Sequence, residues 1–541
     1  MKRFFALILA LLLALSACSV QVDAPTDQIP PPVVSDSATV SPTPDPRPWT
    51  EQLAAYLAGD PLPEYARPPE NGRTWYQIFV YSFRDSDGDG IGDLAGVTES
   101  LDYIKNMGFD GIWLSPIHPS TTYHKYDVKD YLAIDPQYGT MADFDALAAA
   151  CKQRGLDILL DLVINHTSDE HPWFVAAKAG DQRYEAYYHI ESGKHAGWYE
   201  LPGDRSYEAG FWDKMPDLNL RNEDVRGEIA DIVKFWLDKG VRGFRLDAVK
   251  EFESGQDATN IEILTWLHDM AAALKPDVYF VGEDWDTTIR LYAYYASKID
   301  SFFSYPFAGA TGYVGKALLT KDYAAADYVA KIAEAQGLIK AQNPDGTAAP
   351  FLTNHDNPRA SAVFKRDPNL IKTAWGMTLT QPGDAFVYYG EEIGLAGYGK
   401  DENKRAPMFW TDTESAGGNG PAGWDADGMK PIFPPLLAQI ADGDSIFRYV
   451  QHAVRLRAKY PQLGRGDVLP LELAQSSNKV AAVSRTWGYE TIVVIYNLSD
   501  AEVLLPDVEF ELLDWLSATG EAPTQSGIQL KLPPYTIAIL K

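Results

Sequence analysis

Eight short runs of β-forming residues alternate with helical stretches, and this alternation restricts the fold of the chain more than any other feature. Helical patterns such as Ala142–Arg154 and Ile261–Leu274 lie between the runs. The predicted strands are Tyr76–Phe83, Gly111–Leu114, Asp157–Ile164, Gly243–Leu246, Val278–Gly282, Ser301–Phe303, Pro350–Thr353 and Ala385–Tyr389. Strands that alternate with helices form a parallel sheet, and eight of them can close into a (β/α)8 barrel. A doubly wound open sheet is the alternative.

Two segments depart from this alternation. A long connection at residues 165–222 is rich in Trp, Tyr, Gly and His, and long insertions in compact domains are usually functional. After a helix predicted at Ile446–Lys459, the pattern becomes all-β. We therefore predict an α/β fold, a TIM barrel with an inserted loop-rich domain after strand 3 and a C-terminal all-β sandwich. The predicted boundaries are 49–164 and 223–460 for the barrel, 165–222 for the inserted domain and 461–541 for the sandwich.

The N-terminus has the pattern of an export signal. Lys2 and Arg3 precede an apolar run that ends in Leu15-Ser16-Ala17-Cys18, which resembles a bacterial lipobox. This predicts a signal peptide at 1–17, lipidation of the Cys18 thiol, and a flexible Pro- and Ser-rich linker at 18–48. The expected location is extracytoplasmic, lipid-anchored to the bacterial cell membrane. An ordinary signal peptide whose cleavage site contains Cys is the alternative.

Charge and composition restrict the partners. The net charge of −28 argues against nucleic acid, whose phosphates need clustered Lys and Arg, and against electrostatic docking on anionic lipid. Membrane attachment is therefore expected through the N-terminal lipid only. Aromatic residues make up 12% of the chain. That content suits recognition of sugar rings, but large aromatic cores would explain it equally well. The sequence does not set the oligomeric state.

Polar clusters follow four of the predicted strands. In a TIM barrel, catalytic side chains lie at the carboxyl ends of the strands. One such strand end would mean little, but four on one scaffold indicate an active site. The clusters are Asp161-Leu-Val-Ile-Asn165-His166, Gly243-Phe-Arg245-Leu-Asp247-Ala248, Val281-Gly-Glu283-Asp284-Trp285 and Asn354-His355-Asp356.

With these motifs the chain resembles the α-amylase family, glycoside hydrolase family 13, from about Trp75 to the C-terminus. The segment Met215-Pro216-Asp217-Leu218-Asn219 is similar to a fifth motif of a subgroup between oligo-1,6-glucosidases and neopullulanases. The segments Pro382–Glu392 and Arg405–Trp410 also resemble family segments. The resemblance implies an enzyme that hydrolyses α-glucosidic bonds, with an α-glucan such as starch or maltooligosaccharides as its substrate.

The resemblance also implies roles for individual residues. Asp247 is expected to be the nucleophile, Glu283 the acid/base and Asp356 the third acid, which binds sugar hydroxyls. The family retains anomeric configuration, which predicts carboxyl groups about 5–5.5 Å apart. Arg245 leaves the same strand face as Asp247 and should lower the pKa of that carboxyl. The expected substrate-binding residues are Tyr126, His166, Arg245, Lys250 and His355. Asp161 is expected to support its neighbours.

The run from Asp85 to Asp93 predicts a calcium site. Carboxylates alternate along it, glycines allow a tight turn, and the Ile91 carbonyl completes a ligand pattern. Gly96 stands where an EF-hand would have its last Glu. The run instead resembles the short calcium loop of oligo-1,6-glucosidase relatives; a solvated acidic turn is the alternative. The predicted Ca²⁺ ligands are Asp85, Asp87, Asp89, Ile91 and Asp93. A second family calcium site is in doubt, because Glu251 stands where its His ligand is expected.

Two local features bear on specificity. Exo-acting relatives carry an Asp where Tyr123 stands here, and oligo-1,6-glucosidases tend to have Val at Ala248. Both favour endo cleavage of α-1,4 bonds. The alternatives are a neopullulanase- or cyclomaltodextrinase-like hydrolase, a 4-α-glucanotransferase, and a non-catalytic glucan-binding surface lipoprotein.

Overall fold

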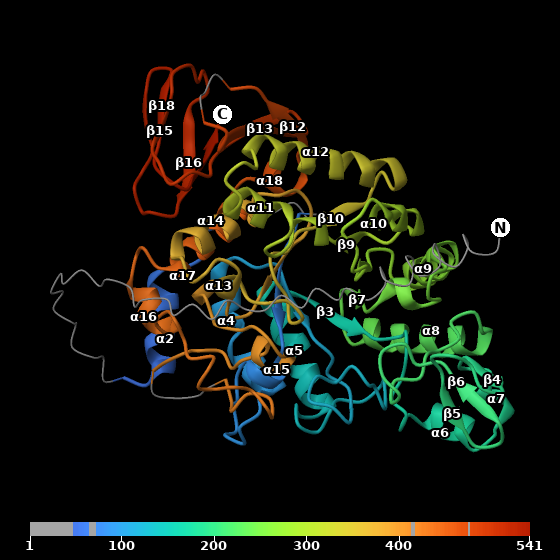
Figure 1. The fold of residues 1–541 in the computed structure, drawn as a ribbon. Helices are drawn as coiled ribbons and strands as arrows, with labels where there is room; N and C mark the ends of the chain where they lie inside the picture. The colour runs from blue at the N-terminus through green and yellow to red at the C-terminus, as the bar shows by residue number, and fades with distance from the viewer. Residues whose placement is uncertain (1–46, 64–71, 413–416, 474–476) are drawn as a thin grey trace, which may run out of the picture. The chain divides into compact units, whose positions relative to one another are not determined.

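A computed structural model describes residues 47–63, 72–412, 417–473 and 477–541. Its centre is an eight-stranded parallel sheet in the order β10-β9-β8-β7-β3-β2-β1-β11 (Figure 1). The strands are β1 (Thr74–Ile78), β2 (Gly111–Leu114), β3 (Asp157–Leu162), β7 (Gly243–Leu246), β8 (Tyr279–Gly282), β9 (Ser301–Phe303), β10 (Thr347–Ala349) and β11 (Ala385–Tyr388). The predicted TIM barrel is confirmed. The predicted signal peptide, Cys18 and residues 18–46 of the linker lie outside the described residues.

One predicted strand is displaced. The seventh strand, β10, is Thr347–Ala349 rather than Pro350–Thr353. It pairs with β9 from Thr347 to Ala349, and the chain then crosses to β11 through a single bridge between Phe351 and Phe386. This bridge joins the two edge strands of the sheet, so the barrel closes at the Pro350 corner.

Helices pack around the barrel strands. The helix α5 (Met141–Arg154) shows how local sequence sets their limits. Thr140 and Asp143 form a capping box at its start, and Gly155 ends it at φ +62°, a conformation that Gly adopts without steric cost. The other main helices are α3 (Leu94–Glu99), α4 (Leu101–Met107), α8 (Glu223–Asp238), α9 (Asp257–Leu274), α10 (Arg290–Ala293), α11 (Tyr313–Leu319), α12 (Ala325–Gln342), α13 (Ala360–Val363), α14 (Pro368–Leu379), α15 (Asp401–Lys404), α16 (Leu436–Ala441), α17 (Ile446–Lys459) and α18 (Pro461–Arg465). An additional helix, α2 (Trp49–Gly59), precedes the barrel and packs on α4 and α16.

The barrel interior changes from apolar to polar along the strands. Side chains that alternate along a strand share a face. On β1, Trp75 packs into an interior aromatic cluster, and Gln77, two residues later, bonds to His355 at the carboxyl end. On β3, Leu159 packs into the same interior cluster, and Asp161, two residues later, forms an ion pair with Arg245. The aromatic layer therefore forms a rigid floor beneath the polar strand ends.

The connection after β3 forms a lobe of its own. It contains α6 (Pro172–Lys178), α7 (Gln182–Glu185) and a small antiparallel sheet of β4 (Ile190–Ser192), β6 (Arg205–Tyr207) and β5 (Tyr199–Leu201). Figure 1 shows this lobe in green. A bridge between His166 and Asp217 holds the ends of the connection together, and one between Tyr188 and Leu218 joins its middle to its end. The long insertion is thereby fixed beside the carboxyl ends of the barrel strands.

The C-terminal region is all-β, as predicted. A five-stranded antiparallel sheet contains β12 (Asp467–Leu471), β13 (Val480–Trp487), β14 (Glu490–Asn497), β19 (Thr536–Leu540) and β16 (Leu512–Ser517). A second sheet contains β15 (Val503–Leu505), β18 (Gln529–Leu532) and β17 (Thr524–Ser526). An apolar cluster that includes Ile495, Leu530 and Leu540 fills the space between the sheets. Buried Arg485 ties this region to the barrel, since it donates to the Thr380 carbonyl at 2.8 Å.

Candidate active site

A cleft of about 440 Å³ opens at the carboxyl ends of the strands. Six of the predicted site residues contribute to its walls: Tyr126, His166, Asp247, Lys250, Glu283 and Asp356. Their side chains come from separate strand ends and loops of the barrel, the arrangement in which a TIM barrel carries an active site. Arg245 and His355 lie behind this wall, 1% and 0% exposed, and act through the residues in front of them.

Arg245 holds the two central carboxyl groups in position. Its Nη1 atom lies 2.6 Å from Asp247 Oδ1, and its Nη2 atom lies 2.7 Å from Glu283 Oε2. The same Nη1 contacts Asp161 Oδ1 at 2.6 Å. A planar guanidinium can bind several oxygens in fixed directions at once, which an ammonium group cannot do. The predicted supporting position of Asp161 is the one found, because it contacts Arg245 and not the cleft.

The backbone after the nucleophile position is strained. Ala248 has φ +48°, a left-handed conformation that costs a non-glycine residue about 1–2 kcal/mol. In this conformation its N–H donates to Glu283 Oε2 at 3.0 Å. The Tyr305 hydroxyl donates to the other oxygen, Oε1, at 3.1 Å. Strain of this kind is found at sites where it sets functional geometry, and here it fixes the Glu283 carboxyl group beside Asp247.

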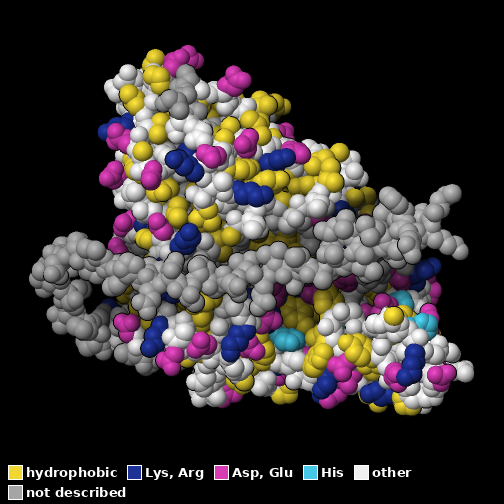
Figure 2. Space-filling model, in the orientation of Figure 1, with side chains coloured by type: hydrophobic (Ala, Val, Ile, Leu, Met, Phe, Trp, Pro, Cys, Tyr) yellow, Lys and Arg dark blue, Asp and Glu magenta, His cyan; other side chains and the backbone are white. Residues whose placement is uncertain are grey.

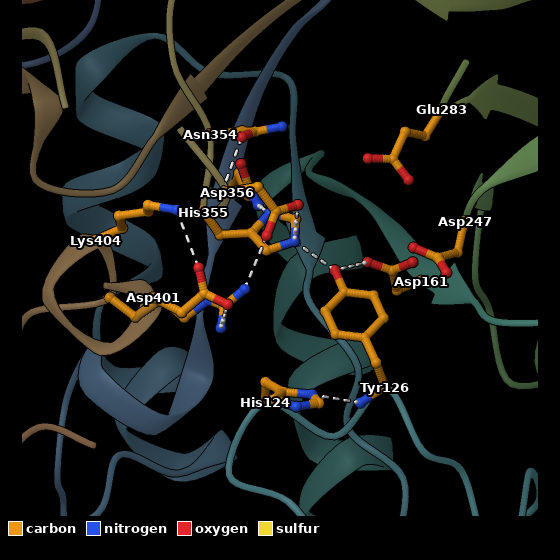
Figure 3. A network of polar contacts seen from close by, with 12 residues as sticks. His124, Tyr126, Asp161, Asp247, Glu283, Asn354, His355, Asp356, Asp401 and Lys404 are labelled. Atoms are coloured by element: carbon orange, nitrogen blue, oxygen red, sulfur yellow. Dashed lines mark hydrogen bonds and ion pairs between the residues drawn. The ribbon is translucent and has the colours of Figure 1, made fainter. Parts of the chain in front are cut away.

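Asp356 and Tyr126 belong to a second network on the other side of the cleft (Figure 3). Asp356 Oδ1 accepts from Arg405 at 2.8 Å, and Oδ2 lies 3.1 Å from His355 Nε2. The His355 ring is nearly parallel to that of Tyr126, and its Nε2 lies 2.6 Å from the Tyr126 hydroxyl. Both ring nitrogens of His355 are therefore engaged by protein groups, Nδ1 by Gln77. His355 orients Tyr126 and Asp356 from behind the cleft.

The carboxyl groups have perturbed proton affinities. Burial raises the pKa of Asp247 well above its usual value, and Arg245 opposes this change. Burial likewise raises the pKa of Asp161 to about 6. The predicted lowering of the Asp247 pKa is therefore wrong in its net direction: Arg245 acts as expected, but the cost of burying a charge outweighs it. One guanidinium faces all three carboxyl groups, so its attraction does not offset the burial of Asp247 and Asp161.

The neighbouring imidazoles are neutral at ordinary pH. Burial lowers the pKa of both His166 and His124 to about 4. A neutral imidazole offers one donor and one acceptor nitrogen. His166 can therefore hydrogen-bond hydroxyl groups without adding positive charge to the cleft.

The sequence did not assign roles to several residues of the cleft wall. Trp285 is 46% exposed and stacks on Tyr305 with centroids 5.2 Å apart; Phe211 is 54% exposed and lies over His166. These are exposed aromatic faces beside the carboxyl groups. The other wall residues, which the sequence did not predict to bind substrate, are His124, Met215, Ala248, Glu251, Asp401 and Arg405. The exposed Trp directly after Glu283-Asp284 was a usable signal, whereas Asp401, at the start of the short helix α15, carried none.

The acidic loop after β1 brings three carboxyl groups together. Ligand oxygens of Asp85, Asp87 and Asp89 lie within 4.8 Å of one another. Asp85 also accepts from the N–H groups of Gly88 and Gly90 and so fixes the turn. Hard oxygen ligands at this spacing fit a divalent cation such as Ca²⁺ or Mg²⁺. Asp93 is placed differently: its carboxyl group caps α3 by accepting from Gly96 N–H at 2.6 Å.

Glu391 and Glu392 form an acidic pair with a structural role. Both are fully buried. Glu392 accepts from the hydroxyls of Tyr76 and Tyr103 at 2.6 and 2.7 Å. The Glu391 carboxylate accepts from the Ala360 N–H. Neither residue lines the cleft, and both stabilise the barrel wall behind it.

The fold and this constellation of carboxyl groups define a glycoside hydrolase. The family model for the α-amylase catalytic domain matches residues 77–466. The chain belongs to the α-amylase family, glycoside hydrolase family 13.

Similar proteins carry related activities in their names. "Alpha-amylase 3" of Dictyoglomus thermophilum is 36% identical over 81% of this chain and 87% of its own length. An oligo-1,6-glucosidase of Parageobacillus thermoglucosidasius is 29% identical over 80% of this chain and 91% of its own. The solved structure of Eubacterium rectale Amy13B superposes with a TM-score of 0.84 and 39% identity, and covers 90% of this chain and 98% of that one. The similar proteins thus include one named an alpha-amylase and one named an oligo-1,6-glucosidase.

Proposed function

We propose that the protein is a secreted, lipid-anchored α-amylase that hydrolyses internal α-1,4-glucosidic bonds in starch and maltooligosaccharides with retention of configuration. The observation that carries this proposal is the contact of one guanidinium, that of Arg245, with both Asp247 and Glu283. Two carboxyl groups that share one guanidinium lie close together. This closeness suits direct attack on the sugar by one of them.

In the first step, Asp247 acts as nucleophile and Glu283 as acid. A carboxylate oxygen of Asp247 bonds to the anomeric carbon while the glycosidic C–O bond breaks. Glu283 gives its proton to the departing oxygen, and the sugar becomes covalently linked to Asp247. Asp356, held by Arg405, and His166 bind hydroxyl groups of the distorted ring. Tyr126 offers its aromatic face beneath that ring.

In the second step, Glu283 acts as base. It takes a proton from a water molecule, whose oxygen attacks the anomeric carbon and releases Asp247. The Ala248 N–H and the Tyr305 hydroxyl keep the Glu283 carboxyl group in place through both steps. A sugar hydroxyl in place of the water would give glucanotransfer.

The proposal of endo cleavage rests on the wall next to Tyr126. Where exo-acting relatives have an acid that caps the non-reducing end, this chain has Tyr123, whose hydroxyl accepts from Arg405 at 2.8 Å. On the opposite side, Lys250 donates to the Trp285 carbonyl at 2.7 Å. Lys250 and the exposed Trp285 ring are positioned for the leaving-group sugars. A cleft with sugar-binding groups on both sides of the carboxyl pair suits cleavage within a chain.

Product analysis tests this proposal. Wild type and Asp247→Asn are incubated with amylose, cyclodextrin and pullulan in the presence of calcium. A rapid fall in amylose chain length by wild type, abolished in Asp247→Asn, is the expected result. Release of single glucose units from chain ends, with little change in mean length, would overturn the endo assignment.

A cyclodextrin- or pullulan-hydrolysing enzyme is the second candidate. The Met215–Asn219 motif favours it, and Met215 lines the cleft. Faster cleavage of cyclodextrin or pullulan than of amylose in the same experiment would establish this candidate in place of the first.

We also propose that Ca²⁺ binds the loop of Asp85, Asp87 and Asp89. The close carboxyl oxygens support this assignment, since three like charges repel one another unless a cation lies between them. Bound there, calcium would stabilise the loop after β1. It would take no part in bond cleavage, because none of these residues lines the cleft.

A further inference from the structure

A second groove lies at the other end of the barrel. Its volume is about 370 Å³, and it is lined by Gln336, Lys340, Pro344, Asp345, Thr347, Pro382, Gly464, Arg465 and Trp487. Thr347 is the first residue of β10, and Pro382 precedes β11. These are amino-terminal ends of barrel strands, whereas the catalytic cleft lies at the carboxyl ends. The two sites are therefore on opposite ends of the barrel.

The β13–β14 hairpin brings one aromatic side chain, that of Trp487, to this groove. Trp487 ends β13 and pairs with Glu490, so the connecting loop is Gly488–Tyr489. Trp487 leaves the same sheet face as Arg485, two residues earlier. That face packs against the barrel, where Arg485 donates to the Thr380 carbonyl. Trp487 consequently reaches the rim of the junction between the barrel and the C-terminal sheets.

The indole ring is both fixed and accessible. The Arg465 guanidinium lies 5.1 Å from the centroid of the Trp487 ring, a cation–π contact that restrains its orientation. The ring is nevertheless 38% exposed, and Tyr489 at the hairpin tip is fully exposed. A large aromatic side chain that is held rigidly at the surface is suited to stacking, because little conformational freedom is lost on binding.

The remainder of the groove is polar. The side-chain oxygen of Gln336 accepts a hydrogen bond from the Val468 N–H at 2.8 Å, and this bond holds the side chain in place. Lys340 donates to the Pro344 carbonyl at 2.7 Å, which leaves further N–H bonds of its ammonium group for a ligand. Asp345 adds carboxylate oxygens to the same wall. A single flat aromatic face among donors and acceptors suits a sugar ring, which has apolar faces and a hydroxyl edge.

Charge argues against other ligands. The chain carries a net charge of −28, which disfavours polyanions. On the face drawn in Figure 2, Lys and Arg side chains are scattered among Asp, Glu and apolar side chains. A hydrophobic protein partner would need an apolar core to its interface, and this groove offers only the indole.

We propose that the groove beside Trp487 is a second, non-catalytic binding site for α-glucan chains, and that the Trp487 ring stacks on a sugar ring. The identity of the ligand rests on the proposed function; the groove itself does not. Because the groove and the cleft face away from each other, a short oligosaccharide cannot occupy both. The site therefore acts on long chains and on insoluble starch, where it holds the enzyme at the polymer surface.

Binding of catalytically inactive protein to insoluble starch tests the proposal. Asp247→Asn and Asp247→Asn/Trp487→Ala are mixed with starch granules, and the unbound protein is measured. The affinity of the double variant is expected to be about tenfold lower, the loss of one stacked aromatic contact. Trp487→Phe, which keeps a flat ring, should restore most of the binding. Equal affinity of Asp247→Asn with and without Trp487→Ala would overturn the proposal.

Matched measurements exclude loss of folding. Phe510→Ala removes an exposed aromatic side chain from the C-terminal region, outside the groove, and should leave starch binding unchanged. With active enzyme, Trp487→Ala should raise KM on granules and leave hydrolysis of short soluble maltooligosaccharides as in wild type. An equal loss on both substrates would mean that the variant acts on the fold, and would also overturn the proposal.

The two proposals fail separately. If wild type cleaves none of amylose, cyclodextrin and pullulan but Trp487→Ala still weakens starch binding, the proposed activity is wrong and the groove is supported. If wild type degrades amylose but Trp487→Ala binds granules as tightly, the groove is wrong and the proposed activity is supported.

Discussion

Arg245 compensates part of the negative charge of three buried carboxyl groups, and this arrangement makes it the residue on which the geometry of the cleft depends most. It is 1% exposed and reaches Asp161, Asp247 and Glu283 from one position. Its two Nη atoms each contact a different catalytic carboxyl group. Removing either its charge or its planar shape should disturb both steps of the reaction.

Arg245→Lys is therefore expected to be strongly impaired. A lysine keeps the charge but presents a single ammonium, which cannot bind Asp247 and Glu283 in the same directions. We expect kcat/KM on maltooligosaccharides to fall about 100- to 1000-fold, the scale of breaking a buried ion pair. Arg154→Lys, which alters a surface pair with Asp102, is the matched control. Activity of Arg245→Lys within a few-fold of wild type would show that one charge alone suffices.

Asp161 offers a test through pH. In the proposed mechanism Asp247 must be ionised to attack, so its raised pKa should make activity fall as the pH drops through that value. The charge on Asp161 is one of the causes that raise this pKa. Asp161→Asn removes that negative charge, so the Arg245 guanidinium is shared by Asp247 and Glu283 only. The pKa of Asp247 should therefore fall.

The acidic limb of kcat/KM against pH should therefore move to lower pH in Asp161→Asn. The kcat/KM profile reports the free enzyme, in which these contacts are observed. A limb that stays in place, or moves to higher pH, would show that Asp161 does not act through the charge of Asp247. Asp145→Asn, a surface substitution, should not move it.

The residues that could be predicted from sequence are those whose position follows from a strand end. Asp247, Glu283 and Asp356 each directly follow a buried run, so the fold alone brings them to one end of the barrel. Phe211 lies in a long loop without periodicity, and Asp401 begins a helix of only four residues, α15. Their approach to the cleft depends on tertiary packing, which no local pattern encodes. The direction of the pKa shift of Asp247 was mispredicted for a related reason, because the sequence does not show how deeply a carboxyl group is buried.

At the scale of elements, the displaced strand shows where pattern and packing conflict. Phe351, Leu352 and Thr353 have stronger β preferences than Thr347, Ala348 and Ala349. The structure nevertheless places β10 at Thr347–Ala349, where the chain lies alongside β9. Small side chains suit this strand because the interior is already filled by Phe303, Phe351 and Phe386, whose rings pack together. Neighbouring strands, rather than local preference, set this boundary.

The acidic loop after β1 is the element whose stability should depend on calcium. Asp87→Asn removes one charge but keeps the oxygen that accepts the Asp89 N–H. In excess Ca²⁺, wild type should unfold about 2–5 °C above Asp87→Asn, since a bound cation stabilises only the folded state. In chelator, the unfolding temperature of wild type should no longer exceed that of Asp87→Asn, and it should equal it or lie below it. The reason is that the variant has less repulsion among its carboxylates.

Thermal unfolding with and without Ca²⁺ measures this reversal. Glu521→Gln, at an exposed acid of the C-terminal region, should behave as wild type in both conditions. A wild type whose unfolding temperature is the same in calcium and in chelator would mean that the loop is a solvated acidic turn.

At the scale of the whole molecule, the proposed attachment to a membrane rests on the N-terminus. No helix of the described residues is long and apolar enough to cross a bilayer. A net charge of −28 opposes adsorption to anionic lipid. The proposed anchor is the lipid predicted on Cys18, at the end of the Leu15–Cys18 motif.

Cys18→Ser tests that dependence. Serine has no thiol to carry the lipid, and the barrel begins only beyond the linker, so folding and specific activity should be unchanged. Most wild-type activity should sediment with membranes and dissolve in detergent, whereas the Cys18→Ser protein should lose this membrane association. Mass spectrometry of wild type should find a lipidated N-terminal cysteine. Cys151→Ser is the matched control, because Cys151 is buried against the barrel and cannot take up a lipid. If Cys18→Ser remains with the membranes as wild type does, anchoring through this thiol is wrong, and attachment must come from another part of the chain.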